Sequence, residues 1–258
     1  MKYKQYEALA SFYDALNPEV DYTAWADFIK KIIEKFGKIE TRLMLDLACG
    51  TGSMSVELSK LGYEVIGVDL SAEMLMEAQN KAYDTEQNIL FLNQDMSELD
   101  LYGTVDAVVC CLDSINYLTD IEKLKKTFAL VNNFMNDGGL FIFDVNTPYK
   151  FKNIYGNNAY ILESEGVLCA WQNTFDEKTS ICDFDLSFFV EKKNGTYERF
   201  DESQREKMYT DTQLREMLKN ASFEVLKVYS NYDFKEYTET DERWYYVCRA
   251  NNKNKNAI

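Results

Sequence analysis

The sequence predicts an α/β fold, a doubly wound, mostly parallel seven-stranded sheet with a small antiparallel β insertion. Three observations support this prediction. Apolar runs of strand length recur through the first 150 residues, amphipathic helical patterns separate several of them, and the pattern changes after Pro148. Alternation of strands and helices is typical of a parallel sheet covered on both faces.

Five runs rich in Val, Ile, Leu and Phe predict the parallel strands. They show little polar alternation, as expected of strands buried on both faces. In order they are RLMLDL, YEVIGVD, NILFLNQD, VDAVVCCLD and GLFIFDVN, all between residues 42 and 146.

Helical patterns occupy the segments between these strands. We expect helices over 53–61 and 72–83, the second with Ser71 as its N-cap. Thr119 and Glu122 have the spacing of a capping box before a helix over 121–135.

The segment after Pro148 predicts the antiparallel insertion, residues 150–208. Apolar residues at 182, 184, 186 and 188 alternate with polar ones, which indicates a sheet wet on one face. Asn194-Gly195 is a strong hairpin signal. Thr210 and Gln213 then predict a capped helix, and FEVLKVYS and ERWYYVCRA two closing strands. We therefore expect a core of residues 1–149 and 209–250, interrupted by this insertion.

Composition limits the partners of the chain. Its 43 acidic and 28 basic residues give a net charge of −15, which disfavours phosphate backbones and anionic membranes. No secretory signal and no run of 18 apolar residues is found, and the six cysteines form no C-x-x-C pair. We expect a cytoplasmic protein with reduced cysteines that binds neither DNA nor membranes. The oligomeric state, monomer or dimer, is left open.

The chain contains no histidine. Mechanisms that need a Ser-His pair, a histidine base or a histidine-bound metal are therefore excluded, and we expect no metal site. A carboxylate, tyrosine, lysine or water must carry any proton transfer.

The stretch LDLACGTGSMS, residues 43–53, places a glycine loop directly after the first strand. It lacks the lysine of a phosphate-binding P-loop, and Ser55 makes it a weak match to a dinucleotide fingerprint. A tight turn that binds nothing is the third interpretation. Asp46 beside the loop favours a cationic ligand.

Two further acids follow the next two strands. Asp69, nineteen residues after Gly50, can accept hydrogen bonds from ribose hydroxyls, and Asp95 ends the third strand, where it can accept from an adenine amino group. Each alone is equally compatible with a helix cap or loop residue. Three acids at successive strand ends are much less expected by chance.

With these motifs in order, the chain resembles the class I S-adenosylmethionine-dependent methyltransferases over residues 6–148. LDLACGTG, VIGVDLSAEML and QDM are similar to the family's first, second and adenine motifs, and VDAVVCCLDSINYL and GGLFIFDVNTP to its fourth- and fifth-strand segments. The lead-in YEALASFYDAL is similar to that of many small-molecule members. CLDSINYL followed by an antiparallel insertion resembles small-molecule members that include glycine and amino-sugar N-methyltransferases. The resemblance implies a Rossmann-like fold and S-adenosylmethionine as cofactor. The residues it implies for cofactor binding are Tyr6, Tyr13, Asp46, Ala48, Gly50, Gly52, Asp69, Leu70, Met74, Asp95, Met96 and Leu112.

The end of the fourth strand bears on the acceptor. It lacks the Pro-Pro signature of DNA and protein-amide methyltransferases, and the chain's prolines are only Pro18 and Pro148. We expect a small-molecule acceptor, with a leaning to an amine nitrogen. Asp113, Asn116 and Tyr117 are the predicted catalytic residues, with Asp113 as candidate proton acceptor; helix capping and turn formation are the alternative roles.

Aromatic residues of the insertion, such as Tyr149, Phe151 and Trp171, are expected over the acceptor. Other functions stay open: a non-catalytic S-adenosylmethionine-binding regulator, a nicotinamide-dependent oxidoreductase, or a methyltransferase acting on RNA or protein.

Overall fold

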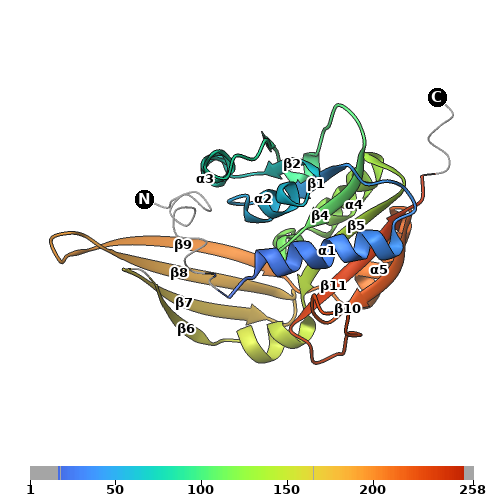
Figure 1. The fold of residues 1–258 in the computed structure, drawn as a ribbon. Helices are drawn as coiled ribbons and strands as arrows, with labels where there is room; N and C mark the ends of the chain where they lie inside the picture. Colours follow the sequence, from blue (N-terminus) through green and yellow to red (C-terminus); the bar gives the residue numbers. More distant parts are fainter. Residues whose placement is uncertain (1–16, 18, 165, 253–258) are drawn as a thin grey trace.

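The computed structural model describes residues 17, 19–164 and 166–252, which form two β-sheets with flanking helices (Figure 1). The helices are α1 (Tyr22–Phe36), α2 (Ser53–Lys60), α3 (Ala72–Asp84), α4 (Ile121–Asn133) and α5 (Asp211–Asn220). The strands are β1 (Leu43–Leu47), β2 (Glu64–Asp69), β3 (Leu90–Asn93), β4 (Val105–Cys110), β5 (Met135–Asn146), β6 (Ala159–Ser164), β7 (Val167–Asp176), β8 (Ile181–Glu191), β9 (Tyr197–Lys207), β10 (Phe223–Tyr229) and β11 (Arg243–Ala250).

The larger sheet has seven strands in the order β10-β11-β5-β4-β1-β2-β3. Neighbours from β5 to β3 pair in parallel, whereas β11 pairs antiparallel with both β5 and β10. The predicted mostly parallel seven-stranded sheet is confirmed. Strands β1 to β4 fall within the first four apolar runs, whereas β5 begins at Met135, before the fifth run and at the end of the helix predicted over 121–135.

Helices cover both faces of this sheet because alternate strand residues point to opposite sides. Met44 packs in the cluster that holds α1 and α2, whereas its neighbour Leu45 packs in the cluster that holds α4 and α5. Ile142 and Phe143 divide in the same way. Burial on both faces explains why the sequence shows continuous apolar runs there rather than alternation.

The smaller sheet is antiparallel, in the order β6-β7-β8-β9. The predicted hairpin at Asn194-Gly195 joins β8 to β9, and Gly195 adopts a left-handed φ of 76° that favours glycine. Cys182, Phe184 and Phe188 are buried on one face of β8 as the alternation predicts. All six cysteines are free and buried.

The three predicted helix starts have different outcomes. Ser71 caps α3 and the Thr210–Gln213 capping box opens α5, as predicted. The capping box at Thr119 is wrong: the N-cap of α4 is Asp120, whose carboxylate accepts from the Glu122 backbone N–H. Asp and Thr are both good caps, so the pattern alone misplaced the helix start by one residue.

The smaller sheet extends to one side of the larger one in Figure 1. Its strand β9 meets the larger sheet where β4 and β5 end: Asn116 Nδ2 donates to the Lys207 carbonyl oxygen at 2.9 Å, and Tyr117 Oη donates to Gln204 Oε1 at 2.9 Å. None of the helices in the described ranges is both long and apolar enough to cross a membrane.

Candidate active site

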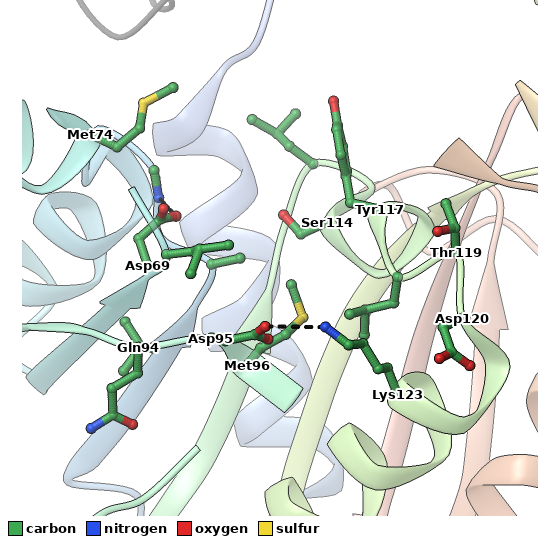
Figure 2. Close-up of a pocket in the computed structure, with 16 residues that line it drawn as sticks. Asp69, Met74, Gln94, Asp95, Met96, Ser114, Tyr117, Thr119, Asp120 and Lys123 are labelled. Carbon is green, nitrogen blue, oxygen red and sulfur yellow. Dashed lines mark hydrogen bonds and ion pairs between the residues drawn. The ribbon is translucent and has the colours of Figure 1, made fainter. Parts of the chain in front are cut away.

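A first cavity of about 340 Å³ opens at the carboxyl ends of the parallel strands (Figure 2). Ligands of open α/β sheets bind at this edge. The predicted residues that line it are Ala48, Gly50, Asp69, Leu70, Met74, Asp95, Met96, Leu112 and Tyr117.

The glycine loop at this cavity depends on left-handed backbone. Gly50 and Gly52 have φ angles of 54° and 74°, which glycine adopts without strain. A Cβ on Gly52 would come within 2.8 Å of the Ala78 Cβ, so Gly52 lets the loop pack on α3. A Cβ on Gly50 would meet nothing within 4 Å, so that backbone has open space above it. Gly52 is therefore needed for packing against α3, whereas Gly50 leaves open space at the cavity.

Asp69 joins the glycine loop to the start of α3. Its two carboxylate oxygens accept from the backbone N–H groups of Gly50 and Ser71, each at 2.8 Å. Burial raises the pKa of Asp69, and these hydrogen bonds act against that rise. The carboxylate lines the cavity with acceptor capacity left for a ligand hydroxyl.

Asp95 follows the end of β3 by two residues and lies between Asp69 and Lys123 in the view of Figure 2. It accepts from the Ser97 backbone N–H at 2.8 Å and pairs with Lys123 at 3.6 Å. Burial would raise the pKa of Asp95, but these contacts lower it. Met96 lines the cavity beside it, and Leu70 does so although its side chain is 67% exposed. Apolar surface next to carboxylate acceptors fits an adenosyl group, whose ring is flat and whose ribose and amino groups donate hydrogen bonds.

Asp46 is placed differently from the other predicted acids. It lies on β1, is 1% exposed and does not line the first cavity. Its carboxylate accepts from the Ser55 hydroxyl at 2.5 Å, which ties β1 to α2. Burial raises the pKa of Asp46 to about 7, and the nearby Asp69 contributes to the rise.

A second cavity of about 430 Å³ lies between the two sheets and shares Leu112 and Tyr117 with the first. One wall is aromatic. Trp171 packs at ring-centroid distances of 5.9 Å from Tyr155, 5.8 Å from Tyr160 and 5.7 Å from Phe184. A polar wall adjoins the aromatic one and carries the side chains of Asp113, Lys150, Gln204, Glu206 and Arg243. Gln204 pairs with Phe184 across β8 and β9, so the two share one face of the smaller sheet.

Asp113 lines this second cavity, at a strained turn. Leu112 and Asp113 both have positive φ, 55° and 51°, which non-glycine residues rarely adopt and which is concentrated at functional sites. The Asp113 carboxylate pairs with Arg243 Nη2 at 2.7 Å. Arg243 also pairs with Asp144, whose buried carboxylate accepts from the Asp113 backbone N–H at 3.0 Å. Burial raises the pKa of Asp144, and Arg243 opposes the rise.

The other two predicted catalytic residues, Asn116 and Tyr117, have different surroundings. Tyr117 lines both cavities. Asn116 is fully buried and lines neither; its amide donates to the Lys207 carbonyl and accepts from the Asn146 backbone N–H at 2.9 Å. Of the predicted lid aromatics, Trp171 lines the second cavity, whereas Tyr149 and Phe151 do not. Tyr6 and Tyr13 lie outside the described residues.

Sequence reasoning predicted Asp113 but missed Lys150, Glu206 and Arg243, which also line the second cavity. Arg243 reaches Asp144 across 99 positions, and Glu206 reaches Asn146 across 60. No local motif marks such contacts. A partial signal existed for Glu206, because Glu202, Gln204 and Glu206 occupy the buried face of a strand where apolar residues are expected.

Comparisons with known proteins agree with this geometry. Residues 44–139 match the family described as "Methyltransferase domain". The chain is 36% identical to "Putative methyltransferase YqeM" of Bacillus subtilis (strain 168), over 95% of this chain and 96% of that protein. A glycine/sarcosine N-methyltransferase of Parasynechococcus marenigrum is 30% identical over 54% of this chain and 51% of its own length.

Solved structures extend the likeness to the whole chain. An S-adenosylmethionine-dependent methyltransferase from Clostridium acetobutylicum superposes with a TM-score of 0.87 at 35% identity, covering 95% of this chain and 99% of that one. An amino pentose methyltransferase from Micromonospora echinaspora shares the fold, with a TM-score of 0.73 at 18% identity over 96% of this chain and 99% of its own. The chain therefore belongs to the S-adenosylmethionine-dependent methyltransferases, and S-adenosylmethionine is its cofactor.

Proposed function

We propose that this enzyme transfers a methyl group from S-adenosylmethionine to the nitrogen of a small-molecule amine. The observation that carries the proposal is the meeting of the two cavities at Leu112 and Tyr117. A cofactor in the first cavity would direct its methyl group towards this junction, and an acceptor in the second would face it.

The size and lining of the second cavity support a small acceptor. A volume of about 430 Å³ lies within the range of small-ligand sites, which is roughly 300–1,000 Å³. Aromatic faces and carboxylates both attract cations. A protonated amine is such a cation. The relative named "Glycine/sarcosine N-methyltransferase", which matches over 51% of its own length, supports nitrogen as the acceptor atom. A regulator without an acceptor site would have this space filled by side chains.

Within this proposal, each cavity residue has a role. Asp69 would hold the ribose hydroxyls, and Asp95 and Met96 would hold the adenine. The backbone of Gly50 would lie against the cofactor. The bound cofactor supplies a methyl carbon made electrophilic by its sulfonium. The protein contributes position and the exclusion of water. Tyr117 would orient the acceptor at the junction, and residues 150–208 would form the lid over it.

The proposal is tested with a methyl-transfer screen using labelled S-adenosylmethionine. Amines, amino sugars, hydroxylated aromatics and tRNA are offered in parallel, and we expect label to enter an amine or amino sugar. Transfer confined to a hydroxylated aromatic would move the acceptor atom to oxygen, and transfer confined to tRNA would replace the small-molecule acceptor.

The cofactor assignment is tested on Asp69. We expect Asp69→Ala to weaken S-adenosylhomocysteine binding by about 1–3 kcal/mol, because hydrogen bonds to a charged acceptor are lost. Isothermal calorimetry measures the affinity. Asp100→Ala is the control, because Asp100 is an exposed acid that does not line the first cavity. An unchanged affinity in Asp69→Ala would remove Asp69 from the cofactor site.

A further inference from the structure

The polar wall of the second cavity contains two kinds of carboxylate. Asp113 is held by Arg243 at 2.7 Å and so has its charge already compensated. Glu206 is 3% exposed, and none of the basic groups in the described part of the chain lies within ion-pair distance of its carboxylate. A buried carboxylate without a cationic partner is costly, so its position in a ligand cavity needs an explanation.

Asn146 holds Glu206 by one oxygen only. Asn146 Nδ2 donates to Glu206 Oε2 at 2.9 Å, while the carboxylate as a whole lines the second cavity. On the other side of the same amide, Lys150 Nζ donates to Asn146 Oδ1 at 3.0 Å. The amide thus connects Glu206 to a buried ammonium group without direct contact between the two.

Lys150 is fixed in this position by its surroundings. Its ammonium lies 5.0 Å from the centre of the Tyr155 ring, in cation–π contact, and it also lines the cavity. A positive charge near Glu206 favours the ionised carboxylate. The arrangement therefore offers a buried carboxylate with a cation nearby, and one of its two oxygens is left for the acceptor.

We propose that Glu206 is the catalytic base of the acceptor site: it binds the protonated amine of the acceptor and removes its proton, while Lys150, acting through Asn146, is a positioning residue that favours the ionised form of Glu206. This inference rests on the proposed function, amine methylation, and assigns the proton transfer to Glu206 in place of Asp113.

The acceptor ammonium gives a proton to Glu206, which becomes a neutral carboxylic acid and leaves a lone pair on nitrogen. That pair forms the new N–C bond while the S–C bond breaks and sulfur keeps its electrons, so the positive charge passes from sulfur to nitrogen. Glu206 releases its proton to water when the product leaves.

Several titratable groups face Glu206 and set its charge. Burial raises the pKa of Glu206 well above its usual value, and Asp113 adds to the rise, whereas Asn146, Lys150 and Arg243 lower it. Burial lowers the pKa of Lys150, as does Arg243, and Asp113, Glu206 and Glu242 oppose this. Tyr155 and Cys182 are also close, and burial raises the pKa of each. Amine binding should therefore increase as pH rises through the ionisation of Glu206.

Benzylamine and its neutral counterpart benzyl alcohol serve as probes, because both carry a ring for the aromatic wall and only one carries a charge. Binding to the full chain, saturated with S-adenosylhomocysteine, is measured by calorimetry or ligand-observed NMR. We expect wild type to prefer the amine by about tenfold or more, as a charge-assisted hydrogen bond provides. Glu206→Gln should abolish this preference, whereas Glu198→Gln, an exposed acid on the same strand paired with Lys192, should keep it.

Lys150→Met gives a second, independent measurement. Removal of the ammonium makes Glu206 harder to ionise, so the increase in benzylamine affinity should move to higher pH, while benzyl alcohol binding should not change with pH. If Glu206→Gln fails to fold, this shift decides the question. An unchanged pH profile in Lys150→Met would then overturn the proposal.

The outcomes separate this inference from the proposed function. Loss of amine preference in Glu206→Gln with S-adenosylhomocysteine affinity retained supports the base assignment. A wild type that binds S-adenosylhomocysteine but does not prefer benzylamine, or a Glu206→Gln variant that keeps the preference, overturns it. A wild type that does not bind S-adenosylhomocysteine instead contradicts the cofactor site.

Discussion

At the scale of single residues, Asp46, Asp69 and Asp95 have different environments although they lie at or near the ends of successive strands. Asp69 and Asp95 line the cavity and are held by backbone N–H groups. Asp46 faces the packing between β1 and α2, where Ser55 is its partner. The sequence predicts where the acids stand, but the side to which each points depends on strand register.

Asp46 should make stability depend on pH. Its pKa is raised from 3.8 to about 7 on folding, because burial disfavours the charged form. Between these two pH values the folded chain keeps a proton that the unfolded chain has lost, so stability falls as pH rises through this window. We expect Asp46→Asn, which cannot ionise, to remove up to about 3 kcal/mol of the wild-type decline between pH 5 and pH 8.

Urea unfolding at several pH values measures this effect. Asp201→Asn is the control, because hydrogen bonds from Ser187 and Arg199 lower the pKa of Asp201 and place its titration below the window. Equal pH slopes for wild type and Asp46→Asn would show that Asp46 does not carry the buried proton.

At the scale of secondary-structure elements, prediction succeeded where local signals decide the outcome. The parallel strands are continuous apolar runs, and β8 shows strict alternation, so both follow from side-chain period. Helix α1 was not predicted, although Trp25, Phe28, Ile29, Ile32 and Ile33 have helical spacing on its buried face. Strand β6 was not predicted either; it lies at the edge of the smaller sheet and pairs only with β7.

The start of α4 provides a test at this scale. Asp120 accepts from the Glu122 N–H at 2.9 Å, whereas the adjacent Thr119 makes no capping hydrogen bond in the described structure. We expect Asp120→Ala to lower the free energy of unfolding by about 1 kcal/mol, because a helix N–H loses its partner. Thr119→Ala should change it by less than about 0.5 kcal/mol.

Denaturant unfolding of the two variants without cofactor makes the comparison. Thr119 and Asp120 both line the first cavity, so either substitution could change cofactor binding. Measurement without cofactor removes that contribution from both variants. A larger loss in Thr119→Ala than in Asp120→Ala would restore Thr119 as the cap.

At the scale of the whole molecule, the second cavity exists because two sheets predicted from unrelated patterns are joined at one place. The larger sheet follows from its apolar runs and the smaller from its alternation, but neither pattern fixes how the sheets meet. Asn116 is central to that junction: it connects the turn after β4, the end of β5 and the end of β9. Prediction of Asn116 as a substrate-orienting residue rested on its position after β4 alone.

Asn116→Ala distinguishes a structural role from a substrate-orienting one. Truncation leaves the Asn146 N–H and the Lys207 carbonyl buried without this partner, so we expect a loss of about 2–4 kcal/mol in the free energy of unfolding. Asn153→Ala is the matched control, because Asn153 is exposed and donates to the Tyr149 carbonyl within one turn.

Urea unfolding of both variants is compared with turnover on the acceptor found by the screen. Retained stability with lost turnover in Asn116→Ala would instead place Asn116 at the acceptor. A stability loss accompanied by weaker amine binding would show that the same contact holds the fold and shapes the cavity, because Glu206 and Lys207 are adjacent on the strand that Asn116 anchors.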